Sequence, residues 1–186
     1  MSAPTVRDAA LPDVPSRAVP FRDVQRSRVS RAEAAWAARL DAARRGAPRA
    51  VVAGSSVLLP GERRFGTLEA AEGFCAGVLA LPAVAAVADV PPPRLRSRRG
   101  ARRAHWEPPG TIALPVPPHG EPWALRETVL LHELAHHVGE LGGRSRGHAA
   151  PFPALVLLLT QAVLGEEAAF ALRVDYGQER VQVGEL

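Results

Sequence analysis

Apolar residues recur at helical spacing along Asp23–Arg45, with arginine and glutamate between them, and a Gly-Ala-Pro sequence ends the run. Ala50–Leu59 contains three valines between flanking prolines, which predicts a strand. Thr67 is a typical N-cap for a second helix over about Leu68–Leu81, which Pro82 closes. The first part of the chain therefore predicts the order helix, strand, helix.

Between residues 83 and 118 the pattern changes to short pieces of β-like sequence separated by proline and glycine. Such pieces are typical of strands joined by tight turns, so we expect a small antiparallel or mixed sheet here. The pieces are Ala85–Val90, Arg94–Arg99, Ala104–Glu107 and Thr111–Val116.

A helix over about Pro122–Val138 follows the last of these strands, because proline suits a first helical turn and glycine-rich residues end the pattern. Ala150–Leu164 and Glu166–Asp175 predict further helices that pack on it. Residues 1–20 are rich in proline and alanine without periodicity, so we expect a flexible tail. The sequence thus predicts one α+β domain over residues 21–186, with the small sheet packed on the helix from Pro122.

The composition limits the class of protein. Of 186 residues, 47% are hydrophobic and 23% are charged, which is typical of a globular domain. The longest apolar stretches, Phe74–Val90 and Phe152–Leu172, are interrupted by proline or by polar residues, so no membrane span is expected. The single cysteine, Cys75, excludes an internal disulfide, and its apolar neighbours indicate a buried position. The first residues lack the apolar core of a secretory signal, so we expect a cytoplasmic protein.

His132-Glu133-Leu134-Ala135-His136 matches the H-E-x-x-H pattern inside the predicted helix. Residues four apart point from one helix face, so His132 and His136 can bind one Zn²⁺. Glu133 lies about 100° further round the axis, where it can reach the open position of the metal without being a ligand. Zinc in such a site activates water, and the carboxylate serves as general base. The motif therefore predicts metal-assisted hydrolysis.

A catalytic zinc site needs a third protein ligand, and several downstream side chains are candidates. His137 projects about 100° away from His136 and is a poor co-ligand. Residues 139–147 are long and flexible enough to turn the chain back, and His148 opens a new apolar helix that can hold it against the first. His148 is therefore the preferred third ligand. The alternatives that remain are Glu140, Glu166 and Glu167.

Two stretches around the motif are recognisable: Trp123–His137, with the sequence WALRETVLLHELAHH, and Gly147–Phe152, with the sequence GHAAPF. With them the chain resembles an actinobacterial family of HEXXH-motif metallohydrolases. Arg22–Val29, Gly100–Glu107 and Thr111–Pro115 extend the likeness over nearly everything after residue 20. The resemblance implies a zincin-like fold and a zinc-dependent hydrolase.

His148 and Phe152 form a His-x-x-x-Phe element that is similar to the SprT-like zinc peptidases, in which this histidine completes the metal site. That likeness implies that His132, His136 and His148 bind the zinc together. Gly142 stands where metzincins have a third histidine, so the metzincin pattern fails. The His-Glu-Leu-Ala-His-His run is also similar to the ImmA-type peptidases that cleave phage repressors, but the Asn/Arg-Phe-Ala-containing helix that follows in that family is missing here.

These features predict a zinc metallopeptidase that hydrolyses a peptide or amide bond in a peptide or protein substrate. The strand Thr111–Pro115 directly precedes the motif helix. In zincin-like peptidases an edge strand in this place pairs with an extended substrate through main-chain hydrogen bonds. Three other side chains are left out of the predicted site: Tyr176 as a half-buried packing residue, and His105 and His119 as surface histidines.

An acid-free run of arginines supports a different class of function. The net charge is +4, and six of the 23 basic residues fall within Arg94–Arg103. A basic hairpin of this kind can lie along nucleic-acid phosphates, although a solvated or acid-paired strand face is the commoner role. The alternative is therefore a non-catalytic zinc module whose Arg94–Arg103 face binds nucleic acid or an acidic partner. A protease acting on a DNA-bound protein would combine both features.

Overall fold

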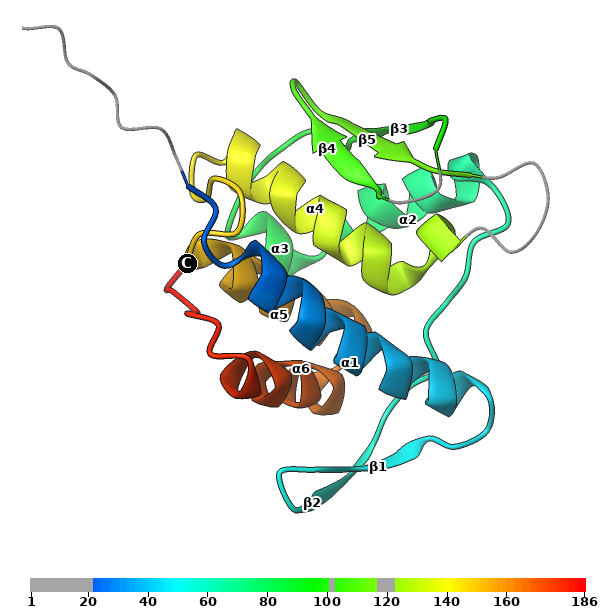
Figure 1. Cartoon of the computed structure of the whole chain (residues 1–186). Helices are drawn as coiled ribbons and strands as arrows, with labels where there is room; N and C mark the ends of the chain where they lie inside the picture. Colours follow the sequence, from blue (N-terminus) through cyan, green and yellow to red (C-terminus); the bar gives the residue numbers. More distant parts are fainter. Residues whose placement is uncertain (1–21, 101–102, 117–122) are drawn as a thin grey trace, which may run out of the picture.

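The computed structural model describes residues 22–100, 103–116 and 123–186. Residues 1–20, His119, Arg102 and the predicted helix start at Pro122 lie outside these ranges. The helices within them are α1 (Arg26–Arg44), α2 (Leu68–Leu79), α3 (Pro82–Ala85), α4 (Glu127–Leu141), α5 (Pro151–Leu164) and α6 (Glu166–Gln178). The strands are β1 (Arg49–Val52), β2 (Ser55–Leu58), β3 (Arg94–Ser97), β4 (His105–Glu107) and β5 (Thr111–Leu114), and Trp123–Leu125 forms a 3₁₀ turn. The chain is thus α+β, as the sequence predicts (Figure 1).

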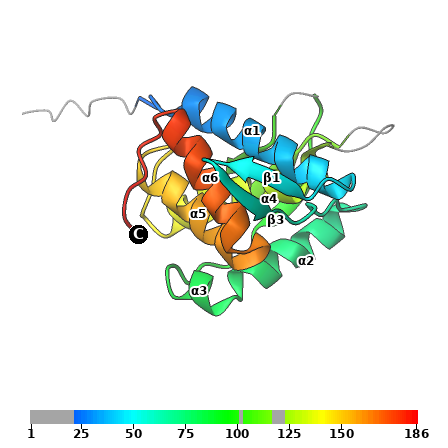
Figure 2. The same cartoon turned by 90° about the horizontal axis from the view of Figure 1, so that it is seen from below.

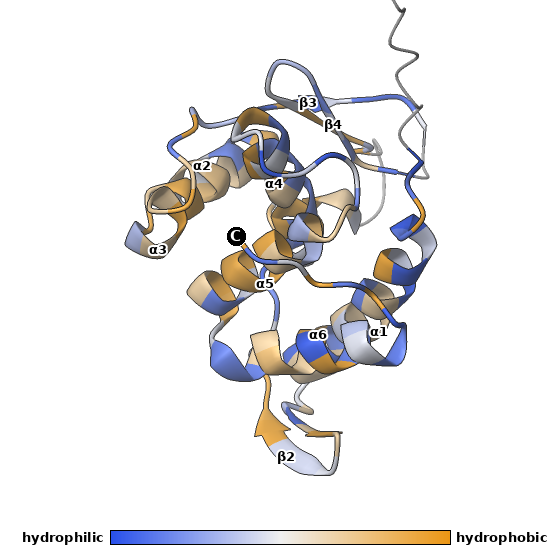
Figure 3. Ribbon diagram, turned by 90° about the vertical axis from the view of Figure 1, so that its left-hand side faces the viewer, coloured by the Kyte–Doolittle hydropathy of each residue, from blue (hydrophilic) through white to orange (hydrophobic). Residues whose placement is uncertain are grey.

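The helices pack around α5, and eight of its 14 residues are buried. It contacts α4 and α6, and α1 runs along α6 (Figures 1 and 2). Hydrophobic residues cover α5 almost throughout (Figure 3), and Phe152, Leu155 and Leu159 are fully buried. Each such side chain stabilises the fold by about 1.5–3 kcal/mol relative to an exposed one. The hydrophobic core therefore includes the space among α1, α4, α5 and α6, and α4 packs against α5.

The three-stranded sheet lies against α4 (Figure 1). Its strand order is β3-β5-β4, with β3 parallel and β4 antiparallel to β5, so the sheet is mixed. The sequence prediction that Thr111–Pro115 is an edge strand is wrong, because β5 is the central strand. Strand β3 pairs with one side of β5, where Leu95 lies opposite Ile112, and β4 pairs with the other side of β5. The edge strand nearest α4 is β4.

Two predicted strands are replaced by other structures. Ala50–Leu59 is not one strand but the hairpin β1–β2, with Val52 opposite Ser55. Ala53 and Gly54 form its turn with φ of 49° and 82°, and two consecutive positive φ values are what a two-residue hairpin turn requires. The predicted strand Ala85–Val90 is also wrong, because Pro82 starts the short helix α3, which ends at Ala85, and residues 86–90 form a turn and an irregular segment. Proline is compatible with a first helical turn as well as with a helix stop.

Other local predictions are confirmed. The Thr67 side chain accepts a hydrogen bond of 3.1 Å from the backbone N–H of Ala70 and so caps α2. Cys75 is fully buried, and burial raises the pKa of its thiol to about 12.

The bounds of helix α4 differ from the predicted ones. It begins only at Glu127, after the 3₁₀ turn, and continues to Leu141, beyond the predicted end at Val138. Among the described residues, no helix combines the length and apolar character needed to cross a membrane.

Candidate metal centre

Three histidines from two parts of the chain meet beside α4. His132 and His136 lie one turn apart on this helix, and His148 lies in the loop that leads to α5. One potential ligand atom from each ring lies within 4.8 Å of the other two. Of the candidate third ligands, the structure brings His148 into the group; among the described residues, Glu140, Glu166 and Glu167 do not belong to it.

The loop between α4 and α5 turns the chain back and so places His148 beside α4. The carbonyl of Gly139 accepts hydrogen bonds from the N–H groups of Arg144 and Ser145, at 2.9 and 3.1 Å. Gly147 has φ of 54°, and its N–H donates to the carboxylate of Glu140 at 3.1 Å. Glu140, a candidate ligand in the sequence, therefore holds the loop that carries His148.

Phe152 packs against all three histidines. Its ring centroid lies 5.0 Å from that of His132, 4.3 Å from that of His136 and 4.7 Å from that of His148. This residue is fully buried on the first turn of α5. The His-x-x-x-Phe element thus has a local physical role, because the phenyl ring fills the space behind the imidazoles and restricts their rotation.

Two carboxylates from outside the motif form hydrogen bonds with the Nδ1 atoms of His132 and His148. Glu33 on α1 accepts a hydrogen bond from Nδ1 of His132 at 2.6 Å, and Asp23 accepts one from Nδ1 of His148 at 2.7 Å. With Nδ1 occupied in this way, Nε2 is the nitrogen left to bind a metal, and Nε2 of His148 is buried without a hydrogen-bond partner. A carboxylate behind a ligating histidine is a common feature of zinc sites. The donor set therefore fits Zn²⁺.

The surroundings of the histidines shift their pKa values in different directions. Burial, together with the neighbouring imidazoles of His132 and His148, lowers the pKa of His136 to about 2. Burial also lowers the pKa of His148, against the opposing effect of Asp23. At His132 burial acts in the same sense, but the Glu33 carboxylate outweighs it and the pKa is raised to about 9. His136 and His148 are therefore neutral imidazoles near pH 7, which is the form that binds metal.

Glu133 lies beside the histidine cluster as a buried carboxylate. Only 4% of the surface of Glu133 is accessible to solvent, and its Oε2 atom is buried without a hydrogen-bond partner. Burial raises the pKa of this carboxyl, while His132, His105 and the backbone of Trp106 partly offset the effect. A carboxyl with a raised pKa next to a metal site suits a group that must accept a proton and then release it.

The three histidines line a cleft of about 870 Å³. One wall is the exposed side of α1, including Arg26 and Ser30, and the other is formed by His105 and Trp106 of β4. The main chain of β4 is an edge of the sheet within the described residues, and it is the strand that borders the cleft. Among the described strands, β4 and not β5 therefore combines a free sheet edge with a place on the cleft.

Comparisons of the chain with protein-family models, with curated proteins and with solved structures found no match. The chemistry of the site is therefore inferred from its own side chains.

Two histidines outside the cluster have structural partners. His137 donates from Nε2 to the carbonyl of Pro91 at 2.7 Å and accepts at Nδ1 from the indole N–H of Trp106 at 3.1 Å. It therefore ties α4 to the sheet, and it lies outside the group of three histidines that the described residues form. His105 contacts Glu107 through Nε2 and Arg98 through Nδ1, each at 2.8 Å. Its place on the cleft wall was missed, because the β4 edge was not predicted.

Asp23, Glu33 and Tyr176, none of which the sequence places at the site, lie behind the histidines. Tyr176 on α6 is fully buried rather than half-buried, and its hydroxyl donates to Oε1 of Glu33 at 2.7 Å. Gln25, just before α1, donates to the carbonyl of His148 at 3.1 Å. No local pattern marks these residues, and only the packing of α1 against α6 brings them to the site.

The arginine run is partly neutralised by neighbours on the sheet. Arg96 forms two hydrogen bonds with the carboxylate of Glu107, at 3.0 and 2.6 Å. Arg98 contacts His105 and donates to the carbonyl of Arg103 at 2.8 Å. These contacts agree with an acid-paired strand face for this part of Arg94–Arg103.

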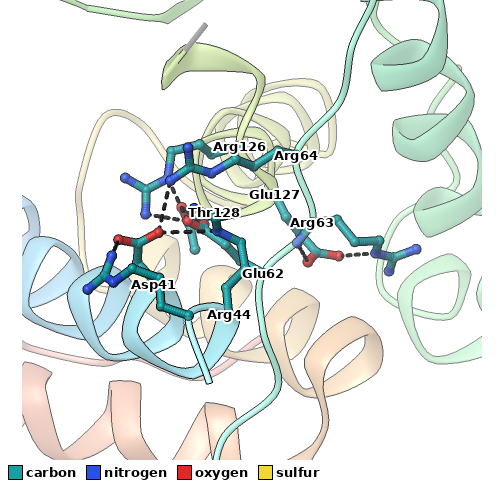
Figure 4. Close-up of polar contacts among 9 residues, drawn as sticks. Asp41, Arg44, Glu62, Arg63, Arg64, Arg126, Glu127 and Thr128 are labelled. Carbon is teal, nitrogen blue, oxygen red and sulfur yellow. Dashed lines mark hydrogen bonds and ion pairs between the residues drawn. The ribbon is translucent and has the colours of Figure 1, made fainter. Parts of the chain in front are cut away.

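Figure 4 shows how the beginning of α4 is held in place. The backbone and the side chain of Arg63 each donate to the carboxylate of Glu127 at 2.8 Å. The carboxylate of Glu62 accepts hydrogen bonds from Arg126 at 2.6 Å and from the hydroxyl of Thr128 at 2.9 Å. Both glutamate side chains are completely shielded from solvent. The segment before α2 thereby fixes the start of the helix that carries His132.

Replacing Glu62 with alanine is expected to lower the free energy of unfolding by about 2 kcal/mol, because Arg126 and the Thr128 hydroxyl lose their acceptor in a largely buried place. Urea denaturation followed by circular dichroism measures the change. Asp41→Ala is the matched control, since Asp41 accepts from Arg64 in the same region but at the surface. An equal loss in both variants would contradict a special role for the buried pair.

Proposed function

We propose that this protein is a zinc-dependent metallohydrolase, and specifically a metallopeptidase of zincin-like fold from the HEXXH-motif group that its sequence resembles. The observation that carries the proposal is the meeting of His132, His136 and His148, with ligand atoms within 4.8 Å of one another, beside the buried carboxylate of Glu133. Three imidazoles that leave a fourth position open to a cleft are the donor set of a catalytic zinc ion.

Each side chain has a distinct task in this proposal. When bound, zinc lowers the pKa of water in the open position and polarises the carbonyl under attack. Glu133 accepts a proton from this water at its free Oε2 atom and returns the proton to the leaving nitrogen. Glu33 and Asp23 hold the Nδ1 atoms of His132 and His148, and this leaves the Nε2 atoms for the metal.

The form of the cleft supports a peptide as substrate. The cleft runs between α1 and β4, and β4 presents main-chain groups along an edge without a further strand among the described residues. An extended peptide can add to such an edge by main-chain hydrogen bonds, which are independent of its sequence. Trp106 and Trp123, which also line the cleft, offer apolar surface for the side chains of the substrate.

The alternative function, a non-catalytic zinc module, is less well supported. A structural zinc site is closed by four protein ligands. The described residues supply three, and the cluster opens into a cleft. Arg96 and Arg98, in the middle of the basic run, already have partners in the sheet. A nucleic-acid surface therefore has less free charge than the sequence suggests.

Zinc-loaded protein is expected to cleave unfolded casein or members of a fluorogenic peptide mixture, since an edge strand selects weakly for sequence. Cleavage is followed by the appearance of new amino groups. The chelator 1,10-phenanthroline should abolish it, and equimolar Zn²⁺ should restore it, because the water is activated by the metal. The isomer 1,7-phenanthroline, which does not chelate, is the control. Cleavage that survives removal of the metal, or a zinc-loaded protein that cleaves none of these substrates, would contradict the proposal.

A further inference from the structure

A continuous set of hydrogen bonds links α6, α1 and α4 at the candidate metal centre. The hydroxyl of Tyr176 donates to Oε1 of Glu33 at 2.7 Å, and the other oxygen of the same carboxylate, Oε2, accepts from Nδ1 of His132 at 2.6 Å. Tyr176 has no exposed surface. Both oxygens of Glu33 are therefore engaged, one by a candidate metal ligand and one by a residue on a third helix.

Two further contacts hold helix α1 against helix α6 near Glu33. The indole N–H of Trp36 donates to the carbonyl of Ala168 at 3.0 Å, and Arg39 forms an ion pair with Asp175. Trp36 and Arg39 follow Glu33 at intervals of three on the same side of α1, so all three meet α6. Tyr176 is adjacent to Asp175 in this interface. The position of α1, and with it the position of Glu33, is set by α6.

The hydroxyl of Tyr176 also restricts the orientation of the Glu33 carboxylate. A glutamate side chain held at one oxygen can still rotate about its terminal bonds, whereas contacts at both oxygens fix the plane of the carboxylate. Burial raises the pKa of Tyr176 well above its ordinary value, so the hydroxyl keeps its proton and remains a donor. Glu33 then presents Oε2 to Nδ1 of His132. This hydrogen bond leaves Nε2 of His132 as the metal-binding nitrogen.

We propose that Tyr176 is a positioning residue of the zinc site, which acts through Glu33 to fix the orientation and the protonated nitrogen of His132. The inference rests on the proposed function in so far as His132 is a zinc ligand. Tyr176 itself does not touch the metal or the substrate. Its hydroxyl, rather than its ring, carries the role, because the ring is needed only to fill the core.

The test is a double-mutant cycle on zinc affinity, measured by competition with a chromophoric chelator. Tyr176→Phe keeps the ring and removes the donor, and it is expected to weaken zinc binding about fivefold, the effect of one hydrogen bond. Glu33→Ala is expected to weaken it by about 10–100-fold, as outer-shell carboxylates do. In the Glu33→Ala background, Tyr176→Phe should have no further effect. The Co²⁺-loaded forms should show altered d–d absorption in Tyr176→Phe and in Glu33→Ala, in the same direction.

Arg31→Gln is the matched control, because it removes an exposed ion pair between α1 and Glu179 without touching Glu33 or Tyr176. It should leave zinc affinity and the Co²⁺ spectrum unchanged. Equal weakening by Tyr176→Phe with and without Glu33, no weakening in the wild-type background, or equal weakening by Arg31→Gln would overturn the inference. Wild-type protein that binds no zinc would contradict the proposed function instead, so the two failures are distinguishable.

Discussion

Glu133→Gln is expected to retain its zinc and to lower kcat for peptide hydrolysis by about 10³-fold, which is the usual contribution of a general base. Glutamine has nearly the same shape, but its amide cannot accept the proton that Oε2 of Glu133 accepts in our proposal. His132 and His148 keep their partners Glu33 and Asp23. Single-turnover hydrolysis of a cleaved peptide and elemental analysis of the same preparations measure both quantities.

Glu167→Gln is the matched control for this change. Glu167 is exposed at the start of α6, and it lies outside the histidine cluster of the described residues. It should hydrolyse the peptide at the wild-type rate. If Glu133→Gln hydrolysed the peptide as fast as this control, Glu133 would not be the base, and a reaction through another group would have to be sought.

His148→Ala is expected to weaken zinc binding by more than about 100-fold, since changes behind a ligand already cost about 10–100-fold. The variant removes one of three imidazoles and leaves the carboxylate of Asp23 without its partner. Zinc per chain after dialysis, measured by elemental analysis, should fall from one to nearly zero. The apo forms of wild type and variant are compared by circular dichroism, so that loss of metal is separated from loss of fold.

Glu166→Ala and Glu140→Gln complete the test of the ligand set. Glu166 was an alternative ligand in the sequence but lies outside the cluster of described residues, so its removal should leave the zinc content unchanged. Glu140→Gln retains an oxygen that can accept from Gly147, and it should also keep its zinc. A full complement of zinc in His148→Ala together with a loss in Glu140→Gln would move the third ligand to Glu140.

The parts of the site that the sequence predicts are those encoded over short distances. His132, Glu133 and His136 follow from helical spacing alone, and their joint position on α4 needs no knowledge of the rest of the fold. His148 was preferred because the glycine-rich loop can turn the chain back, and the structure has the glycines Gly143 and Gly147 at positive φ in that loop. Local conformational preferences were thus sufficient for the histidines.

The carboxylates behind the histidines could not be predicted in this way. Glu33 is 99 residues away from His132, and Asp23 is 125 residues away from His148. On α1, glutamate among arginines is typical of an exposed helix face, and only the packing of α1 against α6 turns Glu33 towards the site. The central place of β5 was missed for a related reason: periodicity identifies a strand but does not give its neighbours in the sheet.

The same long separations have a consequence for the way this protein is synthesised. Contacts between distant residues form late in folding, because the entropy of closing a long loop must first be overcome. A nascent chain emerges from the ribosome amino end first, so it displays the H-E-x-x-H helix before Tyr176 has been made. Until α6 docks on α1, nothing holds Glu33 behind His132. In our proposal, zinc affinity is therefore weaker in a chain whose α6 has not yet docked on α1 than in the folded protein.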